Sequence, residues 1–286
     1  MIRAKLALLS WALLLCLTGA GGQSALGQAA ARATPAPTPA DVHASVTETF
    51  VDASVPDDPA VDKMLTAYTP KVRALDGVIG KLQGDLKKVG VGAGTVGNFI
   101  ADGIRAEASR KLSKPIVLAL TNSGGMRKND IPAGDLRLRD IFELLPFENA
   151  LVAFDLTGAQ MMDLLRVVVS HRDAQSGARV KYRINNDKRA ELESASLLID
   201  GTEKEIDPAA IYTVITIDYL LNVTGGDYAA VLKQAKNTQA LGLTIRDAIT
   251  NYVKAEMAAG RAIKSTLDDR FVLDKAASAA VEGPQP

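Results

Sequence analysis

Apolar residues recur every three to four positions in several segments of the chain, which is the spacing of one face of a helix. This pattern predicts helices over 61–75, 95–112 and 244–253. Thr95 is the predicted N-cap of the second helix, and Pro115 prevents its continuation. A fourth helix is predicted to open after Thr157, because the sequence TGAQ has the form of a capping box.

Short runs of β-branched and aliphatic residues lie between these helices and predict strands. Three of these runs are PIVLAL, ALVAFDL and IYTVITIDYL, at 115–120, 150–156 and 211–220. Segments 78–86 and 268–273 predict further strands, and the pair Asp200-Gly201 predicts a hairpin turn. We therefore expect an α/β fold of the α+β type, with a mixed β-sheet and flanking helices.

The N-terminus has the form of a secretory signal. Arg3 and Lys5 precede an apolar run at 6–17 that is short for a membrane span and is followed by small residues. Cleavage is predicted after Gly27 or after Ala31, and we assign residues 1–27 to the signal. A lipoprotein signal at Cys16 is the minority alternative, because such signals have a small residue where this chain has leucine. The signal predicts a periplasmic or secreted protein.

The remaining chain divides into three parts by composition. Alanine, threonine and proline dominate 28–54, which predicts an extended tether. The segments with core-forming patterns run from 55 to 275 and predict one domain. The last part, 276–286, is rich in alanine, glycine and proline and is predicted to be a disordered tail. No apolar run after the signal reaches the length of a membrane span.

Charge and composition exclude several classes of function. The 33 Lys and Arg residues balance the 33 Asp and Glu residues, and no basic cluster forms a footprint for nucleic acid. His43 and His171 are the only histidines and Cys16 is the only cysteine, which leaves little material for a transition-metal site or a histidine-based triad. We therefore predict no catalytic residue, metal ligand or cofactor in this chain.

Three loops next to predicted strands concentrate the candidate binding residues. They read TNSGGMR at 121–127, PFEN at 146–149 and TGGDY at 224–228. Paired glycines allow a ligand to approach the backbone, and an arginine beside them can bind a phosphate or carboxylate. Aromatic side chains in polar loops can hold a flat apolar ligand such as a nucleobase. The candidates are Asn122, Gly124, Gly125, Arg127, Phe147, Asn149, Asp227 and Tyr228.

Each of these residues also has an ordinary structural explanation. Glycine and asparagine are common in tight turns, so Gly124-Gly125 alone indicates a turn with a solvated Arg127. A single loop aromatic such as Phe147 more often covers the edge of a core than a ligand. Asp227 precedes YAAVLK, where the default role is to cap a helix that begins near Ala229.

The joint order of these motifs resembles the C-terminal domain of the 5′-nucleotidase family. The resemblance runs over about residues 55–273, through VGNFIADGIR, LTNSGGMR, LLPFENALVAFDLTGAQM, DPAAIYTVITIDYL and TGGDY. In that family a two-metal phosphoesterase domain comes first, and the C-terminal domain binds the nucleoside. The resemblance implies that Phe147 and Tyr228 sandwich the base, with Asn149 as a polar contact. It also implies that Asn122 and Arg127 contact ribose and phosphate.

Two departures from the family pattern change this expectation. The family's Gly-Gly-Asp-Gly-aromatic loop is one glycine shorter here, as GGDY, and no two-metal motif occurs in the chain. A two-metal hydrolase needs a cage of His and Asp ligands. We therefore expect a nucleotide-recognition component that acts with a separate metallophosphoesterase subunit, which would hold the divalent metals. A nucleoside-binding module without catalysis and an adaptor without a working pocket are the alternatives.

Overall fold

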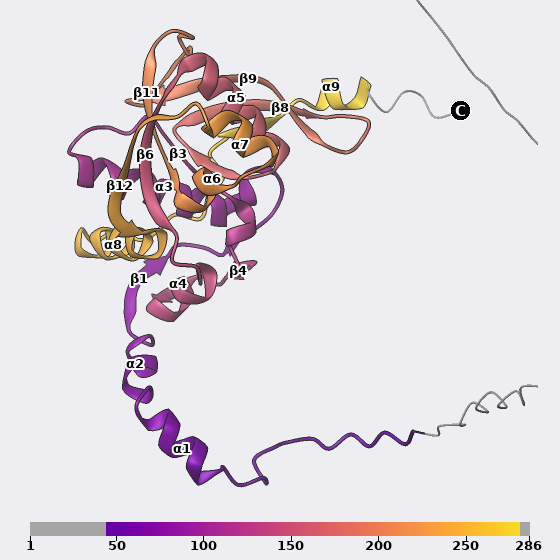
Figure 1. The fold of residues 1–286 in the computed structure, drawn as a ribbon, viewed down its shortest axis with the longest axis vertical. Coiled ribbons are helices and arrows are strands. Elements are labelled where there is room, and N and C mark those ends of the chain that lie inside the picture. Colours follow the sequence, from indigo (N-terminus) through magenta and orange to yellow (C-terminus); the bar gives the residue numbers. More distant parts are fainter. Residues whose placement is uncertain (1–43, 281–286) are drawn as a thin grey trace, which may run out of the picture. The chain divides into compact units, whose positions relative to one another are not determined.

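Residues 44–280 are described by a computed structural model (Figure 1). The chain divides into a short N-terminal unit that ends at Pro56 and a larger unit that begins at Asp57. The described part of the first unit, 44–56, contains no helix or strand. The predicted signal at 1–27, the first part of the tether and the last residues of the tail lie outside the described residues.

The helical pattern at 61–75 forms two short helices rather than one. They are α1 (Pro59–Thr66) and α2 (Thr69–Ala74), and neither contains a buried residue. Pro70 explains the break, because it has no N–H to donate to the carbonyl of Thr66. The apolar side chains of the pattern remain 46–62% exposed: Val61, Met64, Leu65, Tyr68 and Val72.

The central sheet has five strands in the order β12-β6-β11-β3-β7. Strand β11 pairs in parallel with β3 and antiparallel with β6, so the sheet is mixed. Both faces of β6 are covered, because the four consecutive residues 151–154 are all buried and successive strand side chains point to opposite faces. The strands are β3 (Leu118–Thr121), β6 (Ala150–Thr157), β7 (Ala174–Ser176), β11 (Ile211–Ile217) and β12 (Lys236–Thr244).

A second sheet has the order β10-β9-β8-β13. The Asp200-Gly201 turn joins β9 to β10 with positive φ at both residues, which confirms the predicted hairpin. The terminal strand β13 lies parallel to β8. The strands of this sheet are β8 (Ala178–Ile184), β9 (Ala190–Ile199), β10 (Thr202–Lys204) and β13 (Phe271–Leu273). Two small antiparallel pairs join β1 (Val78–Leu82) to β5 (Gly134–Arg137) and β2 (Leu86–Lys87) to β4 (Asp130–Ile131).

Helices pack against these sheets and complete the fold. Helix α3 (Gly94–Leu112) contacts β3, β7 and α8 (Ile245–Ala258), while α5 (Gly158–Ser170) contacts β6, β9 and α7 (Gly226–Leu232). The remaining helices are α4 (Leu138–Leu144), α6 (Asp218–Asn222) and α9 (Lys275–Ala280), with 3₁₀ turns η1 (Val91–Ala93) and η2 (Ser123–Gly125). The predicted capping box at Thr157 is confirmed, and Thr244 forms another at the start of α8. None of the helices described within 44–280 is long and apolar enough to cross a membrane.

Three local expectations are wrong. Thr95 does not cap α3, because the helix begins one residue earlier, after Ala93 in the left-handed region, and the Thr95 hydroxyl accepts from the backbone N–H of Lys87 instead. Asp227 does not cap α7, because the helix begins at Gly226 and places Asp227 inside its first turn. The segment predicted to be a disordered tail begins with α9, where Asp274 accepts from the backbone N–H of Ala277.

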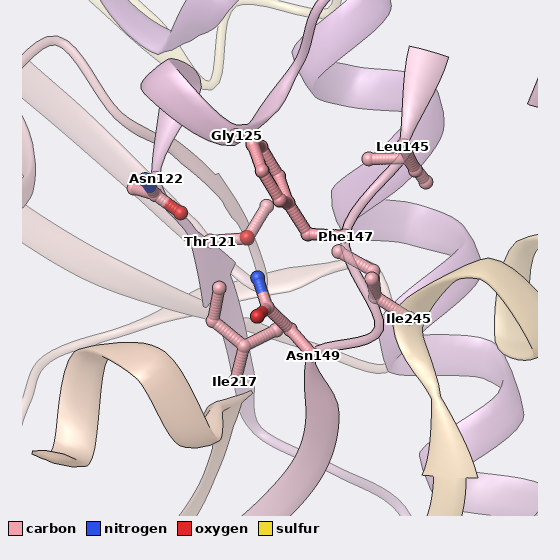
Figure 2. Close-up of a pocket in the computed structure, with 8 residues that line it drawn as sticks. All are labelled: Thr121, Asn122, Gly125, Leu145, Phe147, Asn149, Ile217 and Ile245. Carbon is pink, nitrogen blue, oxygen red and sulfur yellow. The ribbon is translucent and has the colours of Figure 1, made fainter. Parts of the chain in front are cut away.

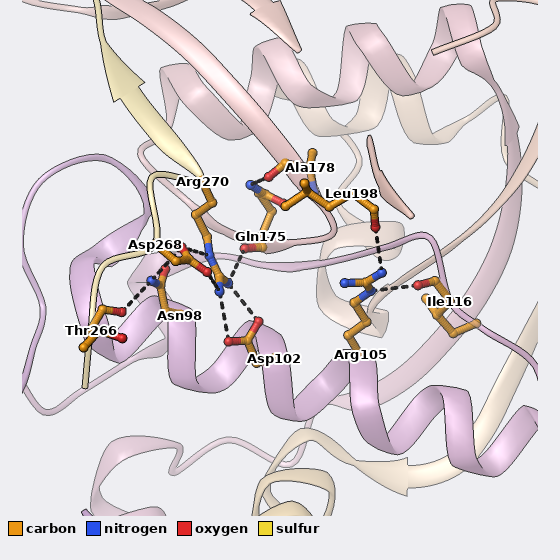
Figure 3. Close-up of polar contacts among 10 residues, drawn as sticks. All are labelled: Asn98, Asp102, Arg105, Ile116, Gln175, Ala178, Leu198, Thr266, Asp268 and Arg270. Atoms are coloured by element: carbon orange, nitrogen blue, oxygen red, sulfur yellow. Dashed lines mark hydrogen bonds and ion pairs between the residues drawn. The ribbon is translucent and has the colours of Figure 1, made fainter. Parts of the chain in front are cut away.

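An ion cluster around the buried Arg270 joins the start of β13 to helix α3 (Figure 3). The side chain of Arg270 is 8% exposed and donates to both carboxylate oxygens of Asp102, on α3, at 2.9 Å each. It also binds Asp268 at 2.6 and 2.7 Å and the backbone carbonyl of Gln175 at 3.1 Å. All the polar groups in this contact are therefore paired, which is what a buried charge requires.

Candidate functional site

The topology of the central sheet brings two of the three candidate loops to one edge. Strands β3 and β11 run in the same direction and end at Thr121 and Ile217, whereas β6 runs in the opposite direction and begins at Ala150. The loops 122–127 and 145–149 and the helix α6 therefore meet at the same edge. Ligands of sheets with parallel strands bind at such carboxyl ends.

A pocket of about 410 Å³ opens between these segments. This volume lies within the range of about 300–1,000 Å³ typical of small-molecule sites. Six of the eight residues predicted for the site line it, and Tyr219 joins them. The lining residues are Asn122, Gly124, Gly125, Arg127, Phe147, Asn149 and Tyr219.

A smaller cavity continues from this pocket toward the core (Figure 2). It shares Asn122, Gly125, Phe147 and Asn149 with the larger pocket, and its floor is apolar, with Ile217 and Ile245 among the lining residues. The Oδ1 atom of Asn122 is buried and has no hydrogen-bond partner among the described residues. A buried acceptor without a partner is costly, so a ligand that donates a hydrogen bond here would remove that cost.

Phe147 and Arg127 form a contact at the mouth of the pocket. The guanidinium carbon of Arg127 lies 5.1 Å from the centre of the Phe147 ring, within the range of a cation–π contact. The ring is still 43% exposed. The backbone N–H of Arg127 donates to the carbonyl of Leu144 at 2.8 Å, which ties the two loops together. This side of the pocket thus presents one cationic group and one partly exposed aromatic ring.

Arg246, at the start of α8, supports the Phe147 loop from behind. Its Nη2 donates to the carbonyl of Pro146 at 3.3 Å and lies 3.7 Å from a carboxylate oxygen of Glu148. The backbone N–H of Ile245 donates to the carbonyl of Asn149 at 2.8 Å. The loop that carries Phe147 is therefore fastened to α8 on both sides of the ring.

Tyr219 is the second aromatic residue of the pocket, and sequence reasoning missed it. The residue lies on α6, directly after β11, and its side chain is 54% exposed. Asp218 fixes the start of this helix, because one of its oxygens accepts from the backbone N–H groups of Tyr219 and Ala150 at 2.8 and 3.1 Å. The available signal is an aromatic residue that closely follows a buried strand, but the apolar pattern predicts a strand that continues to residue 220, whereas β11 ends at Ile217.

Tyr228, the predicted partner of Phe147, is placed elsewhere. It is 6% exposed in the core, and its hydroxyl donates to Asp173 Oδ2 at 2.8 Å. Burial raises the pKa of Tyr228 well above its usual value, and the nearby Asp173 charge raises it further. Because α7 begins at Gly226, the next two residues are helical, and Tyr228 points into the protein.

Asp227 is also outside the pocket. Its Oδ2 atom lies 3.0 Å from Nε2 of His171, at the C-terminal end of α5, and both side chains are exposed. The ring of His171 in turn packs edge-on against Tyr228, with ring centres 5.5 Å apart. The third candidate loop therefore contacts α5 rather than the ligand pocket.

The possibility of a resident metal can be tested on the described residues. Within 44–280, no group of three or more His, Cys, Asp or Glu side chains is arranged to hold a metal ion. The residues around the pocket offer amide oxygens, aromatic rings and one guanidinium. Their chemistry suits a ligand with a flat ring, hydrogen-bond donors and a negative charge.

Comparison with known proteins identifies the family. The model of the 5′-nucleotidase C-terminal domain matches residues 77–234. A trifunctional nucleotide phosphoesterase of Bacillus subtilis is 30% identical over 181 residues, which cover 60% of this chain and 12% of that protein. A 5′-nucleotidase of Vibrio vulnificus is 28% identical over 184 residues, which cover 62% of this chain and 31% of the enzyme.

A solved structure agrees with this result. The 5′-nucleotidase precursor of Thermus thermophilus superposes with a TM-score of 0.62 at 26% identity, over 77% of this chain and 44% of that one. The chain thus spans less than half the length of each of these three relatives. The α/β fold, with its mixed sheet and flanking helices, is that of the family's C-terminal domain. Sequence, fold and the match over 77–234 together establish that the chain belongs to the 5′-nucleotidase C-terminal domain family.

Proposed function

We propose that this chain is the nucleotide-recognition component of a 5′-nucleotidase-type hydrolase. The observation that carries the proposal is the pocket between Phe147 and Tyr219, which combines two accessible aromatic rings with Arg127. Every nucleobase can stack on an aromatic ring, because each base has a flat π-face. The guanidinium supplies the charge that a phosphate needs.

The polar groups of the pocket account for the remaining parts of a nucleotide. Asn122 and Asn149 line the narrow inner part of the pocket, where a ribose hydroxyl or a base amino group would meet them. The unpartnered Oδ1 of Asn122 accepts from such a donor. In this arrangement the base lies along Phe147 and the phosphate lies toward the exposed side chain of Arg127.

Catalysis is assigned to a second protein. The chain has only two histidines, whereas two-metal phosphate hydrolysis needs several metal ligands from imidazole and carboxylate groups. We propose a separately encoded metallophosphoesterase subunit that holds the divalent metals and attacks the phosphate presented by this domain. The signal-like segment at 1–27 supports export, so the complex would act in the periplasm or outside the cell.

Calorimetric titration of the chain tests the recognition role. Adenosine, AMP and UDP-glucose are titrated with and without Mg²⁺ or Mn²⁺, and phosphate release is measured in the same samples. Binding that does not depend on metal, without phosphate release, would support the proposal. Sustained phosphate release from the purified chain would overturn the need for a partner, and the lack of binding by all three ligands would overturn the recognition role.

A further inference from the structure

A buried carboxylate supports the pocket loop from inside the protein. The side chain of Asp173 is 3% exposed, and its Oδ1 accepts from the backbone N–H of Ser123 at 2.6 Å. Its other oxygen, Oδ2, accepts from the hydroxyl of Tyr228 at 2.8 Å. The carboxylate therefore connects two segments that lie about 100 positions apart in the chain.

Asp173 forms no ion pair within the described part of the chain. Burial raises its pKa, although the hydrogen bonds from Ser123 and Tyr228 and the nearby charge of His171 lower it. Removing a carboxylate from water without a counter-charge is costly. The hydrogen bonds from Ser123 and Tyr228 offset that cost. Losing either bond would leave the buried carboxylate less well satisfied, so both donors are held close to Asp173.

The segment held by Asp173 shapes the ligand pocket. Ser123 begins the 3₁₀ turn η2, and the residues on either side of it, Asn122 and Gly124, line the pocket together with Gly125. Asn122 also carries the unpartnered buried oxygen. A displacement of the Ser123 amide would move these lining residues directly, because they share its backbone.

Tyr228 is restrained in turn by its neighbours. Its ring contacts His171 edge-on at 5.5 Å, and His171 pairs with Asp227 one residue before the tyrosine. The hydroxyl of Tyr228 is thus held by Asp173, and its backbone is held in the first turn of α7. This arrangement extends the restraint on the pocket loop to the start of α7.

We propose that Asp173 and Tyr228 are positioning residues that hold the 122–125 turn in the shape that binds the nucleoside. The proposal rests on the recognition role given above, because it concerns the same pocket. In this arrangement the TGGDY segment acts on the ligand indirectly. The tyrosine contributes its hydroxyl to Asp173, and Phe147 and Tyr219 provide the rings that face the ligand.

Substitutions of Asp173 separate positioning from bulk stability. D173A removes both acceptors and should weaken adenosine affinity about tenfold, because the turn that has lost its restraint must be ordered again when the ligand binds. D173N should restore most of the affinity, because Oδ1 still accepts from Ser123 and the amide nitrogen can donate to the Tyr228 oxygen. Y228F should weaken binding a few-fold, while Y252F, on α8 outside the pocket, serves as the matched tyrosine control.

Amide hydrogen exchange at Ser123 gives a readout that does not depend on ligand. The amide should be protected in the unmodified chain and in D173N, and should exchange fast in D173A under conditions where the core strands stay protected. Unchanged Ser123 exchange in D173A would refute the proposal even if no nucleoside binds. If the unmodified chain binds adenosine and D173A binds it equally well, positioning is also refuted, whereas the recognition role stands.

Discussion

Replacement of Phe147 by alanine tests the ligand-binding face most directly. The stacking of one base on an aromatic side chain contributes about 1–3 kcal/mol. The ring here is 43% exposed and lies at an open pocket mouth, which favours the lower part of that range. We therefore expect F147A to cost about 1–2 kcal/mol of binding free energy, or roughly 5- to 30-fold in Kd for adenosine.

The same substitution should change the fold very little. Phe147 lies in a loop and is not part of the buried core, so the free energy of unfolding should fall by no more than about 0.5 kcal/mol. Phe142 offers a matched control, because it is 37% exposed and lies under the guanidinium of Arg246 at 4.4 Å. It differs in being absent from the pocket lining.

Calorimetry with adenosine and urea unfolding of F147A, F142A and the unmodified chain provide the comparison. The expected result is weaker binding in F147A alone, with similar unfolding midpoints in all three proteins. Equal affinities in F147A and the unmodified chain would refute the stacking role. An equal loss of affinity in F142A would also refute it, since the effect would then come from general loosening of the loops.

Further predictions concern charge, helix capping and pH. R127A should weaken AMP binding several-fold while changing adenosine binding less, because the guanidinium acts on the phosphate; an equal loss for both ligands in calorimetry would argue against that role. T157A removes the N-cap of α5 and should lower the free energy of unfolding by about 1 kcal/mol in urea titrations, with no change in adenosine affinity. Burial, aided by the charges of Asp102 and Glu256, raises the pKa of Tyr252 to about 12, so stability that is complete below pH 10 should be lost as the pH rises to 12. Thermal unfolding at pH 9 and pH 11 should show a smaller loss for Y252F than for the unmodified chain, and equal losses would contradict the burial effect.

Much of the fold follows from local sequence patterns. The capping box at Thr157, the buried run that forms β6 and the Asp200-Gly201 hairpin are all found where the sequence predicts them. These signals work because they depend on neighbouring residues alone. The pairing of β13 with β8 in parallel depends instead on contacts between distant segments, and no local pattern predicts it.

In the candidate site, too, some features follow from neighbouring residues and others depend on the folded structure. The sequence indicates that Asn122, Arg127 and Phe147 lie near one another, because they belong to short polar loops directly beside strands, and the sheet brings those loops to one pocket. It does not indicate where the rings of Tyr219 and Tyr228 point, because the start of a helix decides the direction of each ring. A strand that ends at Ile217 turns Tyr219 outward, and a helix that starts at Gly226 turns Tyr228 inward.

The ion cluster around Arg270 joins two segments of the domain that are synthesised at different times. Arg270 and Asp102 lie 168 positions apart, and their contact needs the last strand of the second sheet. During synthesis, α3 therefore carries an unpaired Asp102 until almost the whole domain has been translated. Contacts of such long range slow folding, because a large loop must close before they form. The pairing of Asp102 with Arg270 therefore waits for the C-terminal segment, which is the last part of the domain to be synthesised.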